Sequence, residues 1–380
     1  MGLDVELHLP PDIQVGGGVS ERVGELASGG GLTRVLVVTD PVMVDSGVAG
    51  RVAESLEAAG IATATFSDIT GEPTTDFVDA GVAALRAHEA DGIVAVGGGS
   101  PLDTAKAVSV MASNGGALPD YLGYHKIQQP GVPLIAVPTT AGTGSEVTRV
   151  TVITDTSRDV KMMILSNHLM PRVALADFRL TLTCPPGLTA NVGVDSLTHA
   201  IESYVSAKAN PVTDGFALRA AELIGTYLRR AQSDGGDEEA REALMLGAML
   251  AGAAFSNASV ALVHGMSRPI GAHFHVPHGL SNAVLLPTIT RWSIGGAPER
   301  YATVARAMGL ADEAALVDEL DALNADLGVP RLGELDGVQR DHFDRVKADM
   351  AEAALASGSP GFNPRVPEAE EIIALYDEAW

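Results

Sequence analysis

Cysteine, aromatic residues and positive charge are all scarce in this chain of 380 residues. Its single cysteine, Cys184, excludes a disulfide within the chain and is typical of a reducing compartment. The 25 Lys and Arg residues are outnumbered by 48 Asp and Glu, and the net charge of −23 repels nucleic acids and anionic membranes. Residues 1–19 lack the basic-then-apolar pattern of a secretory signal. These absences predict a cytoplasmic protein that acts on small molecules.

One long uncharged stretch, residues 243–263, has about the length of a membrane span. Glycine, serine and asparagine residues within it lower its hydrophobicity, and a histidine follows it directly. We therefore expect a buried helix of a globular domain here, and not a membrane span.

The first half of the chain alternates β-branched runs with helical stretches. The runs are residues 34–39, 61–66, 92–96 and 133–137, and the helical stretches between them are 46–60, 74–89 and 101–112. This alternation predicts a parallel sheet with helices on both faces.

After about residue 183 the strand signals stop. Long helical stretches follow, at residues 189–207, 212–232 and 238–263. The sequence therefore predicts an α/β domain over residues 1–183 and an all-helical domain over residues 184–380, with a hinge at Cys184-Pro-Pro-Gly187.

A glycine-rich turn follows the third predicted strand and opens a helix. Gly97, Gly98, Gly99 and Ser100 would let backbone N–H groups approach a diphosphate at the helix N-terminus. A tight turn without a ligand is the alternative. Asp103, in the first helical turn, is a candidate for the same cofactor site or for helix capping.

Two further features follow predicted strands. Residues 138–146 contain four hydroxyl side chains and two glycines, and they suit a ligand rich in phosphate and ribose oxygens; the hydroxyls are those of Thr139, Thr140, Thr143 and Ser145. Asp40, after the first strand, would accept hydrogen bonds from ribose hydroxyls and repel a 2′-phosphate. A polar turn and a helix N-cap are the respective alternatives.

The helical half contains a candidate metal site. Asp195 and His199 are four residues apart, so their side chains share one face of a helix, although such a pair is also common on surfaces. Four of the ten histidines lie within fifteen residues: His264, His273, His275 and His278. We expect His264 to end a helix, His278 to precede the apolar helix 280–286, and His273 and His275 to lie on an extended stretch facing solvent or substrate. Three imidazoles with a carboxylate suit Fe²⁺ or Zn²⁺.

In their order along the chain, residues 97–106, 138–148, 193–203 and 264–287 resemble the motifs of the iron-containing (group III) alcohol dehydrogenase family. The resemblance covers nearly the whole chain. It implies a Rossmann-like dinucleotide-binding domain, a helical domain, an active site in the cleft between them, and a dimer or larger assembly.

The resemblance also implies roles for individual residues. Asp195, His199, His264 and His278 become the ligands of Fe²⁺, with Zn²⁺ as the alternative. Gly97 to Ser100 would meet the pyrophosphate of NAD, and the four hydroxyl residues would line the rest of it. Lys161 would lie near the nicotinamide ribose, and Asp40 would favour NAD over NADP.

The implied activity is reversible hydride transfer between NAD and a small alcohol or aldehyde. A glycerol-dehydrogenase- or dehydroquinate-synthase-like enzyme and a non-catalytic NAD- or metal-binding protein are the alternatives. The family has a histidine four residues after the third ligand, where this chain has Arg268. His273 and His275 replace an aromatic residue and an asparagine of the propanediol-oxidising members. Arg268 therefore pairs with a carboxylate of the protein, or it binds an anionic aldehyde with help from His273 or His275.

Overall fold

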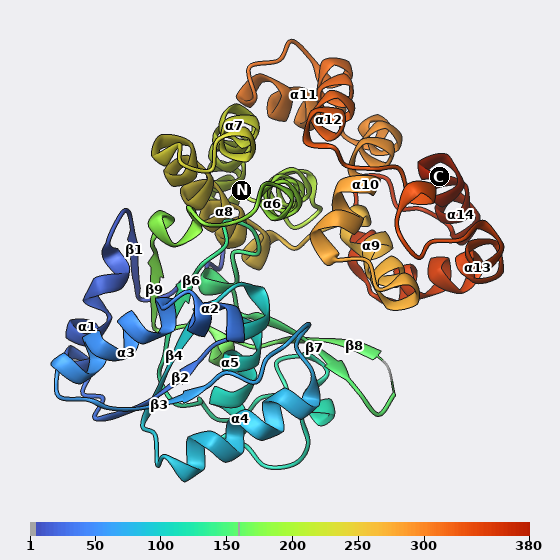
Figure 1. The fold of residues 1–380 in the computed structure, drawn as a ribbon. Helices are drawn as coiled ribbons and strands as arrows, with labels where there is room; N and C mark the ends of the chain where they lie inside the picture. The colour runs from blue at the N-terminus through green and yellow to red at the C-terminus, as the bar shows by residue number, and fades with distance from the viewer. Residues whose placement is uncertain (1–4, 159) are drawn as a thin grey trace. The chain divides into compact units, whose positions relative to one another are not determined.

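The computed structural model describes residues 5–158 and 160–380 (Figure 1). The chain divides into two compact units, His8–Thr183 and Cys184–Trp380, and residues 5–7 group with the second. Residues 1–4, which belong to the segment considered above for a secretory signal, lie outside the described residues.

The first unit is built on a six-stranded parallel sheet with the order β1-β9-β6-β4-β2-β3. Its strands are β1 (Asp12–Val15), β2 (Arg34–Val38), β3 (Ala62–Phe66), β4 (Gly92–Gly97), β6 (Leu134–Pro138) and β9 (Val173–Ala176). The sheet confirms the predicted α/β architecture. β1 and β9 escaped prediction because each has only four residues, too few to show a clear strand pattern.

Alternate side chains of β2 enter two separate cores, as the two-residue period of a strand requires. Val35 and Val37 pack with α1 (Val23–Gly29) and α3 (Val48–Ala58) on one face of the sheet. Leu36 and Val38 pack with α4 (Thr75–Ala87) and α5 (Gly99–Met111) on the other. Helices therefore cover both faces, and the central strands are buried (Figure 1).

The winding direction of the sheet reverses between β2 and β4. β3 lies on one side of β2, whereas β4 lies on its other side and leads on to β6 and β9. Ligands of open parallel sheets bind beyond the carboxyl ends of the strands at such a reversal. Asp40 follows β2 here and Gly97 ends β4, so the topology brings together two residues of the predicted cofactor site.

A second, three-stranded sheet was not predicted. It consists of β5 (Gly123–Tyr124), β8 (Val160–Leu165) and β7 (Val150–Asp155), with β7 and β8 antiparallel. Lys161 lies on β8. Along β7 and β8, buried side chains alternate with more exposed ones, which is the pattern of a sheet with one covered face.

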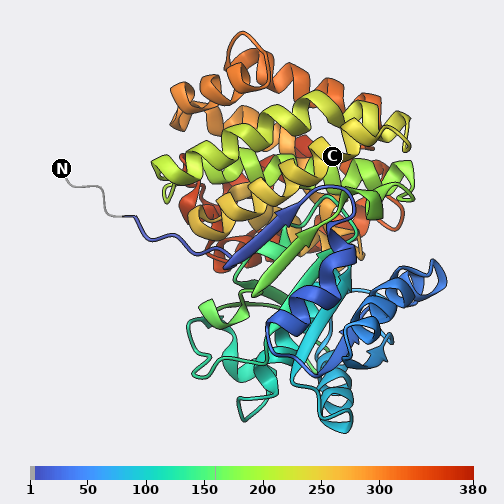
Figure 2. The same cartoon turned by 90° about the vertical axis from the view of Figure 1, so that its left-hand side faces the viewer.

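The second unit is helical throughout its described residues, as predicted. Its helices are α6 (Pro186–Val205), α7 (Pro211–Ser233), α8 (Glu238–Ala258), α9 (Leu262–Phe274), α10 (His278–Ser293), α11 (Pro298–Ala307), α12 (Glu313–Leu327), α13 (Arg340–Ala356) and α14 (Ala369–Ala379). In Figure 2 the long helices of this unit, coloured green to orange, lie side by side in layers.

The expected single helix over residues 238–263 is wrong, because the chain breaks between α8 and α9. Ser259 has a positive φ of 66°, which ends α8, and the axes of the two helices differ by 101°. A non-glycine residue in this conformation leaves no mark in a sequence pattern. Among the described residues no single helix is long and apolar enough to span a membrane. Only α8 and α9 taken together, as a bent pair, have the length and composition that a span requires.

The break changes the setting of three histidines. His264 lies in the first turn of α9 and does not end a helix. His273 lies in the last turn of α9, and His275, with φ 55°, is its C-cap, so the expected extended stretch is also wrong. α9 continues through Pro269, a residue that is uncommon inside helices.

The close contact of α6 with α7 can be tested at Gly193. A Cβ added there would lie 2.3 Å from Cδ1 of the buried Leu228. We expect Gly193→Ala to destabilise the helical unit by about 1–3 kcal/mol through overpacking, and to lower its thermal midpoint by several degrees. Gly187→Ala, on the same helix with no atom near the added Cβ, is the control and should be neutral or slightly stabilising. Equal thermal midpoints of the two variants would contradict the close approach of α6 to α7.

Candidate functional site

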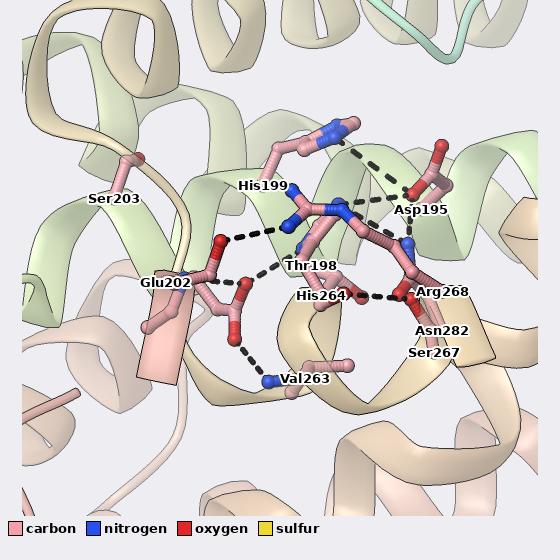
Figure 3. Close-up of polar contacts among 12 residues, drawn as sticks. Asp195, Thr198, His199, Glu202, Ser203, Val263, His264, Ser267, Arg268 and Asn282 are labelled. Atoms are coloured by element: carbon pink, nitrogen blue, oxygen red, sulfur yellow. Dashed lines mark hydrogen bonds and ion pairs between the residues drawn. The ribbon is translucent and has the colours of Figure 1, made fainter. Parts of the chain in front are cut away.

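One carboxylate oxygen of α6 lies among three imidazole nitrogens. Asp195 Oδ1 is 3.9 Å from Nε2 of His199 and 3.6 Å from Nε2 of His264 (Figure 3). It is also 4.0 Å from Nε2 of His278. Asp195 and His199 lie one turn apart on α6, while α9 and α10 supply the other two. All but His278, whose side chain is 40% exposed, are buried. The structure therefore brings together the four residues predicted as ligands.

This spacing suits a single metal ion. Ligand atoms about 2.0–2.2 Å from one ion lie roughly 3–4 Å from each other. Asp195, His199 and His264 can each offer one atom within 4.8 Å of the others. One hard carboxylate oxygen with imidazole nitrogens is a donor set for a first-row transition metal. The residues present therefore fit the iron or zinc that the sequence predicts.

The electrostatics keep two of the donors, Asp195 and His199, in the forms that bind metal. Burial opposes the charged form of Asp195, but the neighbouring imidazoles outweigh it and hold the pKa of the carboxyl well below its usual range. Burial lowers the pKa of His199 to about 4, so this imidazole is neutral near pH 7 and keeps a lone pair. Its ring is held by stacking, with its centroid 4.3 Å from that of Phe255 and 4.5 Å from that of His264.

Glu202 orients His264, a role that the sequence analysis missed. This buried residue lies on α6, seven residues after Asp195. Its carboxylate accepts hydrogen bonds from His264 Nδ1 at 2.6 Å and from the backbone N–H groups of Ala261 and Val263 at 2.9 and 2.5 Å. It thereby caps the start of α9, which has no side-chain cap of its own, and fixes the ring whose Nε2 faces Asp195. Its position three residues after His199, on the same face of the helix, is the sequence feature that could have indicated this role.

Asn282, one turn after His278 on α10, is a second missed residue. Its Nδ2 donates to Asp195 Oδ1 at 2.6 Å and lies 3.1 and 3.2 Å from Nε2 of His264 and His278. The side chain is fully buried. The amide therefore ties α10 to the carboxylate of α6, and its i+4 spacing from His278 could have indicated it.

Gly279 permits the close approach of α10 to α6. A Cβ at this position would lie 2.6 Å from the carbonyl oxygen of Asn191 and 3.4 Å from Cβ of Asp195. Because a backbone atom cannot move aside as a side chain can, any larger residue would push His278 away from Asp195.

Arg268 lies four residues after His264 on α9. Its Nη1 donates to Ser359 Oγ at 2.9 Å, and Figure 3 shows its guanidinium beside His199 and His264. His273 and His275 are placed differently. The His273 ring contacts the rings of Phe274 and His342, and His275 is exposed at the end of α9. Of the three predicted substrate-side residues, the described contacts bring only Arg268 to the metal site.

In the first unit, Asp40 and the glycine turn lie together. Asp40 is the N-cap of α2 (Pro41–Asp45), and its Oδ1 accepts from Met43 N at 2.9 Å. Its Oδ2 lies 3.2 Å from the position that a Cβ on Gly97 would take. Gly97 has a φ of 147°, which a side chain would rarely adopt. Asp40 thus lies at the end of a strand, next to the glycine turn, as predicted. It also caps a helix, which was the alternative interpretation of this residue.

The glycine turn packs against the hydroxyl loop. A Cβ on Gly98 would lie 3.5 Å from Thr140, and one on Gly99 would lie 2.9 Å from Thr143. Gly98 is the N-cap of α5 and provides no side-chain bond to the helix N–H groups. Ser100 follows in the first turn. The contact with Thr143 therefore requires a glycine at position 99. The N-terminal amides of α5 form the kind of site that anions bind.

Other predicted cofactor residues have structural contacts. The backbone N–H of Thr139 donates to Gly97 O at 3.0 Å, which joins the two loops. Ser145 Oγ donates at 2.6 Å to Asp103, a buried carboxylate that also accepts from Val152 N at 2.8 Å. Asp103 thus fastens the hydroxyl loop to α5 and β7. On β8, Lys161 Nζ forms a 2.6 Å ion pair with Glu72.

Two family models match the chain, one in each unit. Residues 10–178 match iron-containing alcohol dehydrogenase, and residues 189–380 match the C-terminal part of the Fe-containing alcohol dehydrogenase family. An NAD-dependent methanol dehydrogenase from Bacillus methanolicus is 36% identical, with 98% of each chain covered. A lactaldehyde reductase from Escherichia coli (strain K12) is 38% identical over 92% of this chain and 93% of its own. The structure of a 1,3-propanediol oxidoreductase superposes with a TM-score of 0.95 at 36% identity, over 100% of both chains.

The role of Glu202 can be tested by Glu202→Gln. Glutamine keeps the size but replaces an acceptor oxygen by an NH₂ group facing an N–H donor. We expect the affinity for Fe²⁺ or Zn²⁺ to fall roughly 10–100-fold and the free energy of unfolding to fall by about 1–3 kcal/mol. Competition with a chelator and thermal unfolding measure the two effects.

The control is Glu222→Gln, which changes an exposed glutamate of α7 that pairs with Arg219. Metal affinity of this variant should equal that of the wild type. Wild-type metal affinity in Glu202→Gln would show that Glu202 caps α9 without orienting His264.

Proposed function

The chain belongs to the iron-containing alcohol dehydrogenase family, and we propose that it interconverts a small alcohol and its aldehyde with NAD as the hydride carrier and one divalent metal ion. The supporting observation is the group of three imidazole nitrogens within 4.0 Å of Asp195 Oδ1. A buried, preorganised donor set of this kind serves catalysis better than it serves a protein that only binds NAD.

Asp195, His199, His264 and His278 hold the metal, which we propose to be iron, and zinc suits the same donors. When bound, the ion supplies Lewis-acid polarisation of the alcohol or aldehyde oxygen. Glu202 keeps the His264 ring in position, and Asn282 holds the Asp195 carboxylate. His278, the most exposed of the four, marks the side of the site that is open to a substrate.

Residues of the first unit hold NAD at the reversal point of the sheet. Gly97, Gly98, Gly99 and Ser100 meet the diphosphate at the N-terminus of α5, and Thr139, Thr140, Thr143 and Ser145 line the rest of the dinucleotide. Asp103 acts through Ser145. Lys161, held by Glu72, contacts the nicotinamide ribose. Asp40 accepts from the adenosine ribose and selects NAD over NADP.

This proposal assigns NAD binding to residues 1–183 and metal binding to residues 184–380. The scarcity of cysteine supports a cytoplasmic location, and the net charge of −23 argues against nucleic acid or membrane partners. We also propose a homodimer or larger assembly, as the resemblance implies. Size-exclusion chromatography with light scattering tests the assembly.

The ligand set is tested by His278→Ala. We expect bound metal and turnover to fall to a few per cent of wild type, because three donors remain and the open side of the site loses its imidazole. NADH affinity should stay within about twofold, since the NAD residues belong to the other unit. Metal analysis and NADH fluorescence titration provide the measurements. The control is His88→Ala, which removes a histidine of the first unit. Full metal content in His278→Ala would contradict the assignment.

The cofactor preference is tested by Asp40→Gly and Asp40→Asn. Either change removes the charge that repels a 2′-phosphate, so kcat/KM with NADPH should rise at least about tenfold relative to NADH. Glycine and asparagine are both accepted N-caps, so the first turn of α2 should remain folded. A wild-type enzyme that prefers NADPH would contradict the role of Asp40.

A further inference from the structure

Arg268 is a positive charge held at the metal site. It lies one turn after His264 on α9, so both side chains share a face of the helix. Its Nη1 bonds to Ser359 Oγ at 2.9 Å, and Ser359 is buried in the short helix η8 (Ser359–Phe362). η8 packs tightly on α9, because a Cβ on Gly265 would lie 2.7 Å from Pro360. The guanidinium is therefore anchored beside His199 and His264 (Figure 3).

The charges of the site explain why this position matters. Two carboxylates, Asp195 and Glu202, offset the two charges of a divalent ion. The oxygens of Glu202 are engaged by two backbone N–H groups and His264 Nδ1. Arg268 adds one further positive charge, and its electrostatic effect is among the causes that lower the pKa of His199. With its metal bound, this group of residues carries a net positive charge in a protein whose total is −23.

We propose that Arg268 determines the substrate class: the preferred aldehydes and alcohols carry a second, anionic group that the guanidinium binds. A carboxylate, sulfonate or phosphonate presents oxygens that match the planar fork of arginine. The hydrogen bond from Nη1 to Ser359 Oγ sets the direction of the guanidinium fork. This inference rests on the proposed function.

The reaction itself is unchanged by this assignment. The aldehyde carbon gains a hydride from NADH and the aldehyde oxygen gains a proton, which yields the primary alcohol and NAD⁺. Arg268 takes part in no bond change, so it is a specificity residue. A fixed local cation also gives an anion a binding point on a surface that otherwise repels it.

The test compares aldehydes that differ in charge. Succinic semialdehyde is compared with butanal, and sulfoacetaldehyde and phosphonoacetaldehyde are compared with propanal, in wild type, Arg268→Met and Arg268→Lys. In Arg268→Met the anionic-to-neutral ratio of kcat/KM should fall roughly 10–100-fold, with the rate on neutral aldehydes within about threefold of wild type. Arg268→Lys should retain part of the preference, since it keeps the charge but loses the fork. The three anions identify which oxyanion fits.

The matched control is Arg340→Met, which removes the same charge from an exposed position where Arg340 pairs with Asp344 and Asp377. Its anionic-to-neutral ratio should equal that of wild type. Ser359→Ala separates anchoring from folding, because it keeps the guanidinium and removes its support. A partial loss of preference with an unchanged melting temperature is expected.

A binding measurement makes the test independent of turnover. Calorimetry of 4-hydroxybutyrate and of 1-butanol, on metal-loaded protein with and without NADH, should show tight binding only for the anion and its loss in Arg268→Met. Metal content is determined for every variant.

Two failures are distinguishable. An unchanged ratio and unchanged anion binding in metal-replete Arg268→Met would overturn the role of Arg268 and leave the proposed function standing. Absence of NADH-dependent turnover on every aldehyde by metal-loaded wild type would refute the proposed function, and the calorimetry would still decide whether Arg268 binds the anion. If Arg268→Met does not fold, Arg268→Lys and Ser359→Ala provide the comparison, and a wild-type ratio in both overturns the proposal.

Discussion

The burial of one carboxylate, Asp195, among three imidazoles constrains the whole helical unit. A buried anion is costly unless positive or polar groups surround it, so α6, α9 and α10 must each deliver a side chain to the same place. Asn282 donates to the carboxylate directly, and Gly279 lets α10 lie against the backbone of α6. The close helix packing around α6 is therefore a condition of the proposed metal site.

Glu202 links this site to the least regular part of the fold. The chain breaks sharply at Ser259, and α9 begins without a side-chain cap. The Glu202 carboxylate accepts hydrogen bonds from two buried backbone N–H groups at the start of α9 and from His264 Nδ1. The same three hydrogen bonds thus stabilise the break and orient a proposed metal ligand, His264. Arg268, one turn further along α9, acquires its position from this arrangement, because the direction of α9 determines where its side chain lies.

The proposed cofactor site of the first unit requires the backbone to lie close to a polyanionic ligand. Gly97 is required by its positive φ and by the closeness of Pro101, and Gly99 is required because Thr143 lies where its side chain would be. Asp103 holds the hydroxyl loop to α5 through Ser145. This is a rigid frame at the reversal point of the sheet, in which the amides of α5 remain directed at one place. The chemistry of hydride transfer then depends on positioning, and NAD provides the reactive carbon.

The fold class and the glycine and hydroxyl loops could be predicted from the sequence, because they depend on local periodicity and on residue types. The four candidate ligands came from the resemblance of the sequence to a known family, since the histidine cluster alone did not show which members bind. The sequence did not determine the break at Ser259, the start of α9 or the strands β1, β7, β8 and β9, since short strands and a non-glycine residue of positive φ leave no periodic signal. The roles of Glu202 and Asn282 and the placement of Arg268 were decided by tertiary structure alone. Their contacts join helices distant in sequence, and such contacts arise only when the helices pack.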